Sequence, residues 1–257
     1  MSNSKRSAKM EGKEKKDNSL HVSQREKIDF DLNIRPFNFE LTENQKKFIE
    51  LANDKKTNCI ICDGPAGAAK SFTAVYCALT RMKEKKSSDI IYIRSLIQAK
   101  DAETGFLSGD LEQKLYYYNI PMFDKLNELL DEGTIKRLHN DHRIKTYPTS
   151  LIRGNSWNAQ DVIADEMQNA LFTSLVTILT RVGRYSKCYI LGDSDQNDFG
   201  SKSGFKEFYD LFNDSESKEN GIYTLKFTAD DIVRSELVKF VVKKIESYMK
   251  EKKHEQR

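Results

Sequence analysis

One stretch of the sequence combines glycines, small side chains and a lysine in the way that binding of a phosphate group requires. In order, its residues are Gly64, Pro65, Ala66, Gly67, Ala68, Ala69, Lys70 and Ser71, with Phe72 directly after them. Small side chains let backbone N–H groups converge on phosphate oxygens, and Lys70 supplies a full positive charge. The hydroxyl of Ser71 is of the type that binds Mg²⁺ beside a nucleotide. The sequence therefore predicts a phosphate-binding loop over residues 64–71, with Phe72 as a further ATP-binding residue.

Ala69 departs from the usual pattern of such loops, G-x-x-x-x-G-K-[ST], in which a glycine precedes the lysine. If the backbone at this position needs a positive φ, an alanine costs on the order of 1 kcal/mol. A cost of this size predicts nucleotide binding that is about fivefold to tenfold weaker, but not abolished.

Two adjacent carboxylates form the second candidate group. Asp165 and Glu166 directly follow the apolar residues Val162, Ile163 and Ala164. In nucleotide hydrolysis the first carboxylate of such a pair holds Mg²⁺, and the second polarises the attacking water. The alternative is a helix N-terminus at which both acids satisfy backbone donors. Together with the loop, the pair favours hydrolysis, with Ser71 and Asp165 at the metal and Glu166 as the general base.

Polar residues also follow a third apolar segment. Gly192 and Asp193 come directly after residues 185–191, and Gln196 lies three residues further on. Open α/β sheets bind ligands at the carboxyl ends of their strands, where Asp193 and Gln196 could sense a γ-phosphate or position a water. A turn held by hydrogen bonds from the Asp193 side chain is an equally good alternative. The residues alone do not decide between the two.

The candidate groups need a scaffold that brings strand ends together, and the hydrophobic pattern predicts one. Apolar runs typical of buried strands cover residues 58–63, 89–94, 143–147, 161–165, 185–191 and 222–227. Helical patterns cover residues 43–53, 70–85, 111–130, 172–181 and 230–250, with an interruption expected near Pro121. Alternating strands and helices predict an α/β fold with a mainly parallel sheet and helices on both faces.

Composition narrows the class of protein. The 257 residues are 38% hydrophobic and 32% charged, which fits one main soluble domain. We expect a flexible charged arm over residues 1–28, the domain over 29–250 and a charged tail over 251–257. The N-terminus lacks the apolar region of a signal peptide, and no apolar run approaches the roughly 18 residues of a membrane span. These features predict a cytoplasmic protein with no membrane partner.

The cysteines and the net charge are less informative. Cys59, Cys62, Cys77 and Cys188 lie in apolar segments without the spacing of a zinc site. Cys59 and Cys62 share one expected strand, where residues three apart point to opposite faces. Buried reduced thiols in a reducing compartment explain them best. A net charge of +3 is weak evidence for a nucleic-acid partner.

The order and spacing of these groups resemble the PhoH-like family of P-loop ATPases, which are related to the core of superfamily 1 helicases. The similarity extends from about residue 42 to 245. The segments that carry it, besides the loop, are Thr42-Glu43-Asn44-Gln45, Gly105-Phe106-Leu107-Ser108-Gly109-Asp110-Leu111, Arg153-Gly154, Asp165-Glu166-Met167-Gln168-Asn169, Leu179-Thr180-Arg181-Val182-Gly183, Gly192-Asp193 and Ile232-Val233-Arg234-Ser235. With no PIN nuclease domain beside this core, the sequence resembles the short form of the family.

The resemblance implies a RecA-like ATPase that uses ATP and Mg²⁺ and works as a ring, a hexamer in the family. It also implies an association with RNA or another single-stranded nucleic acid, in a helicase-like role. By the same resemblance Gln45 reads the adenine, and Arg181 and Arg234 are candidates to contact the γ-phosphate. Such an arginine is worth about 10³–10⁵ in rate in related systems. The alternative for both arginines is an ordinary surface position.

Aromatic residues leave further alternatives open. Tyr116, Tyr117, Tyr118 and Trp157 could stack on bases. Consecutive helical residues point in different directions, however, which favours core or subunit contacts for the tyrosines and a buried anchor for Trp157. The rival function for the chain is a nucleotide-dependent scaffold with negligible turnover. Glu166 argues against it, because a site that only binds ATP or ADP does not need a second carboxylate.

Overall fold

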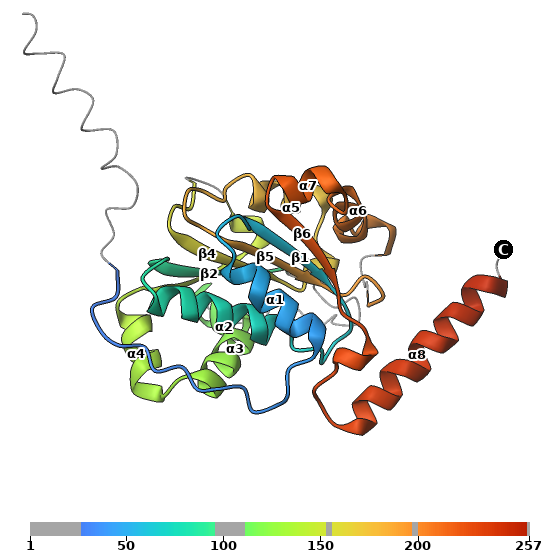
Figure 1. Cartoon of the computed structure of the whole chain (residues 1–257), viewed down its shortest axis with the longest axis horizontal. Helices are drawn as coiled ribbons and strands as arrows, with labels where there is room; N and C mark the ends of the chain where they lie inside the picture. The colour runs from blue at the N-terminus through green and yellow to red at the C-terminus, as the bar shows by residue number, and fades with distance from the viewer. Residues whose placement is uncertain (1–26, 96–110, 153–155, 197–199, 256–257) are drawn as a thin grey trace, which may run out of the picture.

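A sheet of six parallel strands forms the centre of the computed structural model, which describes residues 27–95, 111–152, 156–196 and 200–255. The strands lie in the order β3-β2-β4-β5-β1-β6 (Figure 1). Their bounds are Cys59–Asp63 (β1), Asp89–Arg94 (β2), Ile144–Pro148 (β3), Gln160–Asp165 (β4), Cys188–Gly192 (β5) and Ile222–Lys226 (β6). Parallel neighbours require crossover connections, which the helices between the strands provide. The predicted α/β fold with a parallel sheet is confirmed.

Helices cover both faces of the sheet. Four helices pack on one face: α1 (Glu43–Asn53), α2 (Lys70–Lys83), α3 (Leu111–Leu129) and α4 (Glu132–Asn140). Two helices, α5 (Phe172–Leu179) and α6 (Phe205–Leu211), pack on the other. The short α7 (Ser215–Glu219) precedes β6, and α8 (Glu236–Glu255) ends the described chain. Short 3-10 turns occupy Thr149–Leu151 (η2), Met167–Asn169 (η3), Gly200–Lys202 (η4) and Ala229–Asp231 (η5).

The central strand β1 shows why the core has two halves. Ile60 and Cys62 pack with the α1 and α2 side, whereas Cys59 and Ile61 pack with the α5 and α6 side, because successive side chains of a strand alternate between faces. All four cysteines are buried and free. The expected opposite orientation of Cys59 and Cys62 is therefore confirmed.

Helix α3 differs from the expectation at Pro121, which lies inside a continuous helix. A proline in a helix interior costs about 3 kcal/mol through a lost hydrogen bond and a steric clash. Met122, Leu126 and Leu129 of the same helix are buried in the core, and each such side chain contributes about 1.5–3 kcal/mol. Burial thus outweighs the local cost, and the helix is not interrupted.

The two ends of the domain also differ from the expectation. Ile28 is buried in the core, so the folded domain includes a residue assigned above to the arm. The last helix begins at Glu236 rather than near residue 230, because Asp231 caps the turn η5 and the N–H group of Val233 donates to the carbonyl of Gly67. Residues 105–110 and 153–154, and the side chains of Tyr116, Tyr117 and Tyr118, lie outside what the structure describes.

Candidate nucleotide-binding site

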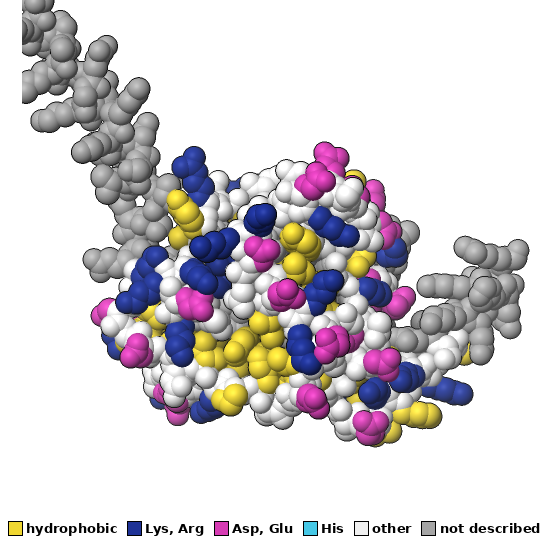
Figure 2. Space-filling model, viewed as in Figure 1, with side chains coloured by type: hydrophobic (Ala, Val, Ile, Leu, Met, Phe, Trp, Pro, Cys, Tyr) yellow, Lys and Arg dark blue, Asp and Glu magenta, His cyan; other side chains and the backbone are white. Residues whose placement is uncertain are grey.

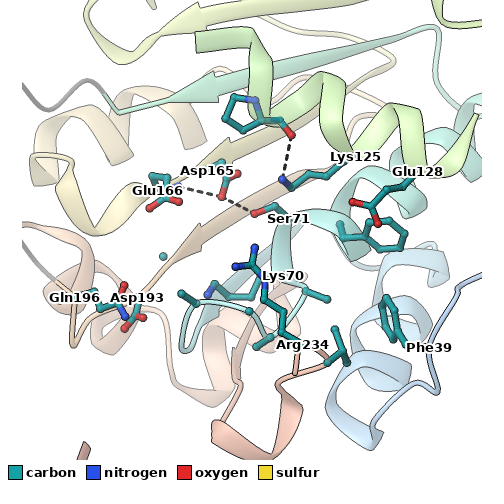
Figure 3. A pocket seen from close by; sticks show the side chains of 18 of the residues that line it. Phe39, Lys70, Ser71, Lys125, Glu128, Asp165, Glu166, Asp193, Gln196 and Arg234 are labelled. Atoms are coloured by element: carbon teal, nitrogen blue, oxygen red, sulfur yellow. Dashed lines mark hydrogen bonds between the residues drawn. The ribbon is translucent and has the colours of Figure 1, made fainter. Parts of the chain in front are cut away.

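The predicted groups meet at one edge of the sheet, because parallel strands end on the same side. Asp63 at the end of β1 pairs with Gly192 at the end of β5 and with Lys226 of β6, and Asp165 ends β4. A pocket of about 360 Å³ opens there (Figure 3), within the roughly 300–1,000 Å³ of small-molecule sites. Its lining comprises Asn38, Phe39, Ala66, Gly67, Ala68, Ala69, Lys70, Ser71, Phe72, Pro121, Lys125, Glu128, Asp165, Glu166, Gln168, Gly192, Asp193, Gln196, Val233 and Arg234.

The backbone of the loop has the special geometry that its sequence indicated. A Cβ atom at Gly64 would lie 2.5 Å from the Cβ of Phe227, so only glycine fits. Gly67 has φ +85°, and Ala69 has φ 59° in the left-handed region. Ala69 therefore has the positive φ at which an alanine is strained. The cost on the order of 1 kcal/mol applies to this alanine.

Lys70 begins helix α2, and its side chain curls over the loop. The ammonium Nζ donates to the carbonyls of Gly64 (2.5 Å) and Pro65 (2.9 Å). Both carbonyls lie at the start of the loop, whereas residues 66–72 face the pocket. The positive charge of Lys70 is thereby held at the N-terminus of a helix, where backbone N–H groups also attract anions.

Asp165 accepts three hydrogen bonds that fix its carboxylate, one of them from the N–H group of Glu166 to Oδ1 (3.1 Å). The Ser71 hydroxyl donates to Oδ1 (2.8 Å), and the Tyr92 hydroxyl donates to Oδ2 (2.8 Å). Burial, and the neighbouring Asp165 charge, raise the pKa of Tyr92 well above its usual range, so the phenol stays a donor at every physiological pH. The first carboxylate of the pair is thus rigidly oriented beside the loop (Figure 3).

Glu166 turns away from the strand on a left-handed backbone, with φ 58°. Its Oε2 accepts a hydrogen bond from Nε2 of Gln168 (2.7 Å), and Oε1 lies 4.0 Å from the Arg94 guanidinium. Gln168 in turn accepts a hydrogen bond from the N–H group of Asp193. Gln168 therefore connects the second carboxylate to the end of β5, a link that the sequence did not assign.

Asp193 forms the expected turn and also lies at the pocket, so both interpretations of the sequence stay open. Its carboxylate accepts a hydrogen bond from the Asp195 N–H group (3.1 Å), which forms the turn, and its side chain also lines the pocket. Burial raises the pKa of Asp193, and the nearby Lys70 charge opposes that shift. Gln196 is exposed at the same end of the pocket. The structure thus brings Asp193 and Gln196 beside Glu166 (Figure 3).

Gln45 occupies a different place from the one expected. Its side chain is fully buried behind the loop, where Nε2 donates to the carbonyls of Ala68 (3.2 Å) and Asp231 (3.0 Å) and Oε1 accepts from Thr42 N–H (3.0 Å). The side chain has no accessible surface and does not line the pocket, so its contact with an adenine ring stays a prediction from the family resemblance. Gln45 ties α1, the loop and η5 together.

The two candidate arginines lie in different environments. Arg234 lines the pocket, beside Gly67 and Lys70 (Figure 3). Arg181 follows α5 and does not line this pocket. Its carbonyl accepts a hydrogen bond from the N–H group of Trp157 (2.8 Å), and Trp157 is half-buried there. Of these two arginines, Arg234 is the one that lines the pocket of its own chain.

Phe72, which the sequence assigned to nucleotide binding, lines the other end of the pocket together with Phe39, and their ring centroids are 5.7 Å apart. Phe39, Lys125 and Glu128 escaped sequence reasoning, and Phe37 contacts both aromatic rings. Lys125 and Glu128 reach the pocket from α3 (Figure 3). Phe39, Lys125 and Glu128 belong to no motif. The alternating aromatic residues of the Phe37-Asn38-Phe39 stretch were the available signal.

The donor groups fit a magnesium ion. Ser71 and Asp165 offer a hydroxyl and a carboxylate, the hard oxygen ligands that Mg²⁺ prefers alongside waters and phosphate oxygens. Over the described ranges, no cluster of three or more His, Cys, Asp and Glu side chains could form an all-protein metal cage. The described helices include none that is both long and apolar enough to cross a bilayer.

Comparisons with known proteins match most of the chain. The profile of a family described as PhoH-like protein matches residues 39–246. A PhoH-like protein of Mycobacterium tuberculosis is 32% identical over 203 residues, which cover 78% of this chain and 56% of that protein. One from Bacillus subtilis is 32% identical over 212 residues (82% and 63%), and Protein PhoH of Escherichia coli is 27% identical over 201 residues (77% and 55%). The chain thus spans little more than half the length of these relatives.

A solved structure supports the fold. The large terminase from a thermophilic bacteriophage superposes with a TM-score of 0.51 at 14% identity, covering 77% of this chain and 48% of that one. At this level of identity the likeness concerns the fold alone. Together with the parallel sheet and the loop after β1, it identifies a RecA-like α/β domain.

Proposed function

This chain belongs to the PhoH-like protein family, and we propose that it binds ATP with Mg²⁺ and hydrolyses the bond between the β- and γ-phosphates. The observation that carries the proposal is the meeting of the loop with the carboxylate pair. Ser71 of the loop donates to Asp165 at 2.8 Å, and Glu166 follows directly with its carboxylate in the same pocket.

Each residue has a role that follows from its position. N–H groups of the loop and the Lys70 ammonium hold phosphate oxygens. Ser71 and Asp165 hold Mg²⁺, which neutralises developing phosphate charge when bound. Glu166 accepts a proton from the attacking water, and Gln168 orients its carboxylate. Gln196 and Arg234 contact the γ-phosphate.

The aromatic end of the pocket is the proposed position of the base. Phe39 and Phe72 present ring faces and edges to the cavity, and Asn38 adds an amide that can hydrogen-bond a base edge. Gln45 supports this arrangement indirectly, because it fixes the carbonyl of Ala68 in the loop.

We further propose that hydrolysis is coupled to RNA or another single-stranded nucleic acid in a cytoplasmic, ring-shaped assembly. The family resemblance supports this extension. In such a ring Arg181 would act on the pocket of a neighbouring copy, since it does not reach its own. A nucleotide-dependent scaffold with negligible turnover is the competing function.

Steady-state phosphate release by three variants tests hydrolysis. We expect Lys70→Ala to lose nucleotide binding, and Glu166→Gln to bind ATP normally but turn over at least about 100-fold more slowly. Glu219→Gln makes the same chemical change on the exposed α7 and should retain full activity. Equal rates for all variants and wild type would leave only the scaffold function.

The nucleic-acid coupling has its own test. Addition of single-stranded RNA should raise the rate of the wild type but not of Glu166→Gln, and the stimulation should fall as salt is increased. If single-stranded RNA leaves the rate of ATP hydrolysis unchanged at low salt, the proposed coupling is wrong, while the ATPase proposal stands.

A further inference from the structure

Two charged side chains of α3 line the nucleotide pocket and have no part in the chemistry described so far. Lys125 and Glu128 come from a helix that is separate in sequence from both the loop and the strand ends. Elsewhere, charged side chains of both signs are spread over the open surface (Figure 2). We propose that Lys125 and Glu128 recognise the α-phosphate and the ribose of the bound nucleotide, which makes the site selective for ribonucleotides. This inference rests on the proposed function, because it assigns two further contacts in the same site.

The two side chains face the pocket because they share one side of α3 with Pro121. At 100° per residue, positions 121, 125 and 128 fall within an arc of about 60°, and all three residues line the pocket. Met122 and Leu126 of the same helix are buried in the core, roughly 100° further round the helix axis. Packing of this core side sets the rotation of the helix. The fold therefore fixes the direction in which Lys125 and Glu128 leave α3.

A separate segment of the chain holds the end of α3 in place. The backbone N–H group of Arg35 donates to the carbonyl of Leu129 (2.8 Å), and its guanidinium donates to the carbonyl of Asn127 (2.8 Å). Arg35 lies four residues before Phe39, which lines the aromatic end of the pocket. The segment that carries Phe39 and the helix that carries Glu128 are thus joined to each other beside the pocket.

Lys125 and Glu128 have opposite charges three positions apart, a spacing at which helical side chains commonly pair. In the part of the chain that the structure describes, however, neither forms an ion pair, and the Lys125 ammonium donates to the carbonyl of Pro121 at 3.0 Å. Lys125 is half-buried. Because hydrogen bonds between two charged groups are stronger than those to a neutral carbonyl, phosphate oxygens are a better partner for this ammonium. The pocket therefore offers a second cation, besides Lys70, to an anionic ligand.

The order of the residues across the pocket matches the order of the parts of a nucleotide. In Figure 3, Lys125 extends toward Ser71 and Asp165, and Glu128 lies between Lys125 and Phe39. Along the helix axis the two α3 residues are about 4.5 Å apart. A nucleotide whose terminal phosphates are bound at the metal residues and whose base is at Phe39 places its α-phosphate and ribose between them. Lys125 lies on the phosphate side of this interval, and Glu128 lies on the base side.

The chemistry of each side chain suits its assigned partner. A carboxylate only accepts hydrogen bonds, and ribose hydroxyls donate them; an acidic residue recognises ribose in this way in dinucleotide-binding folds. An ammonium is a common partner for phosphate oxygens. A hydrogen bond to a charged group typically changes affinity about 10-fold or more. Loss of either contact is therefore large enough to measure.

Calorimetric titration with nucleotide analogues tests the ribose contact. Wild type should bind ATP about 10-fold more tightly than at least one of 2′-deoxy-ATP and 3′-deoxy-ATP, and Glu128→Ala should bind all three equally. Glu132→Ala removes the same charge from the exposed side of α4, outside the pocket, and should keep the wild-type preference. If Glu128→Ala keeps that preference, or changes the ratio of ATP to GTP affinity instead, the ribose contact is wrong.

The same titration with ATP and ADP tests the phosphate contact. Lys125→Met should weaken the binding of both by the same factor, about 10-fold, because both carry the α-phosphate. Lys125→Arg keeps the charge and should restore most of the affinity, which shows that the loss is not a folding defect. Lys136→Met removes a lysine from α4 outside the pocket and should bind like wild type. Unchanged binding by Lys125→Met, or weaker binding of ATP alone, would contradict a contact with the α-phosphate.

Binding and turnover together separate this inference from the proposed function. A wild type that binds no nucleotide contradicts both. A wild type that hydrolyses ATP but binds ATP and its two deoxy analogues equally contradicts the ribose contact and leaves the ATPase proposal standing. Selective binding of ATP without hydrolysis contradicts the ATPase proposal and supports the α3 contacts.

Discussion

The hydroxyl oxygen of Ser71 lies 2.8 Å from a carboxylate oxygen of Asp165, although the two residues are 94 positions apart in the chain. The contact joins the loop after β1 to the end of β4, across the intervening strand β5. No local secondary-structure preference could create this contact between distant residues. It exists because parallel strands deliver their ends to one edge of the sheet.

The first prediction concerns magnesium. Asp165→Asn should raise the Mg²⁺ concentration needed for half-maximal hydrolysis by about 10–100-fold, because the neutral amide is a poorer partner for a hydrated cation. Titration of the ATPase rate with Mg²⁺ measures this. Ser71→Ala should show the same direction of change, whereas Ser71→Thr keeps the hydroxyl and should resemble wild type. An unchanged Mg²⁺ requirement in Asp165→Asn would place the ion elsewhere.

The second prediction concerns Ala69, whose φ of 59° disfavours a side chain. Ala69→Gly should relieve on the order of 1 kcal/mol of strain, partly offset by the greater freedom of glycine in the unfolded chain. Urea unfolding should therefore show equal or higher stability. ATP affinity, measured by calorimetry, should rise by at most about tenfold.

Lys85 supplies a matched control for Ala69. It has almost the same backbone conformation, with φ 57°, and lies in the exposed turn after α2 at the opposite end of that helix from the loop. Lys85→Gly should change stability in the same direction as Ala69→Gly without any effect on ATP affinity. Weaker ATP binding by Ala69→Gly would show that the alanine improves the loop.

The third prediction separates two roles for Gln45. Gln45→Met removes three hydrogen bonds inside the domain and should cost about 2–4 kcal/mol of stability. Because the side chain is buried behind the loop, the ratio of ATP to GTP affinity should stay the same while both affinities fall. Gln160→Met, at the start of β4 and outside the pocket lining, should lower stability without changing the affinity for ATP or GTP. If Gln45→Met changes the ratio of ATP to GTP affinity, the wild-type Gln45 side chain contacts the adenine directly.

The sequence predicted the scaffold well because its signals were local. Residues 89–94 form the expected strand, since a buried parallel strand requires a continuous apolar run. Helix α1 starts at the expected place because Thr42 and Gln45 form a capping box. The prediction was wrong at Pro121, where burial of Met122 and Leu126 overrides a local rule.

The site was predicted in part, for a related reason. Asp165 ends β4 and Glu166 follows it, while Lys70 and Ser71 begin the helix after the loop that leaves β1. The topology alone therefore brings them together. Phe39 reaches the pocket through an irregular segment whose path is set by tertiary packing, which no short pattern encodes. The mutual hydrogen bonds that bury Gln45 likewise depend on the position of η5, almost two hundred residues later.

The fourth prediction uses pH. Burial lowers the pKa of Lys187 from 10.5 to about 8; Arg81 adds to this shift, and Asp161 opposes it. Between those two values the unfolded chain holds a proton that the folded chain has released, so this lysine makes the protein more stable as pH rises. The melting temperature of wild type minus that of Lys187→Met should therefore increase by a few degrees from pH 7 to pH 10. A flat or falling difference would contradict a lowered pKa.

The hydrogen bond between Trp157 and the carbonyl of Arg181 has a practical consequence. Trp157 is the single tryptophan of the chain, and it lies half-buried beside Arg181, the residue proposed to act on a neighbouring copy. Indole emission shifts with the polarity of its surroundings. The molecule therefore carries its own optical reporter at this place, and assembly can be followed in real time without attaching a dye.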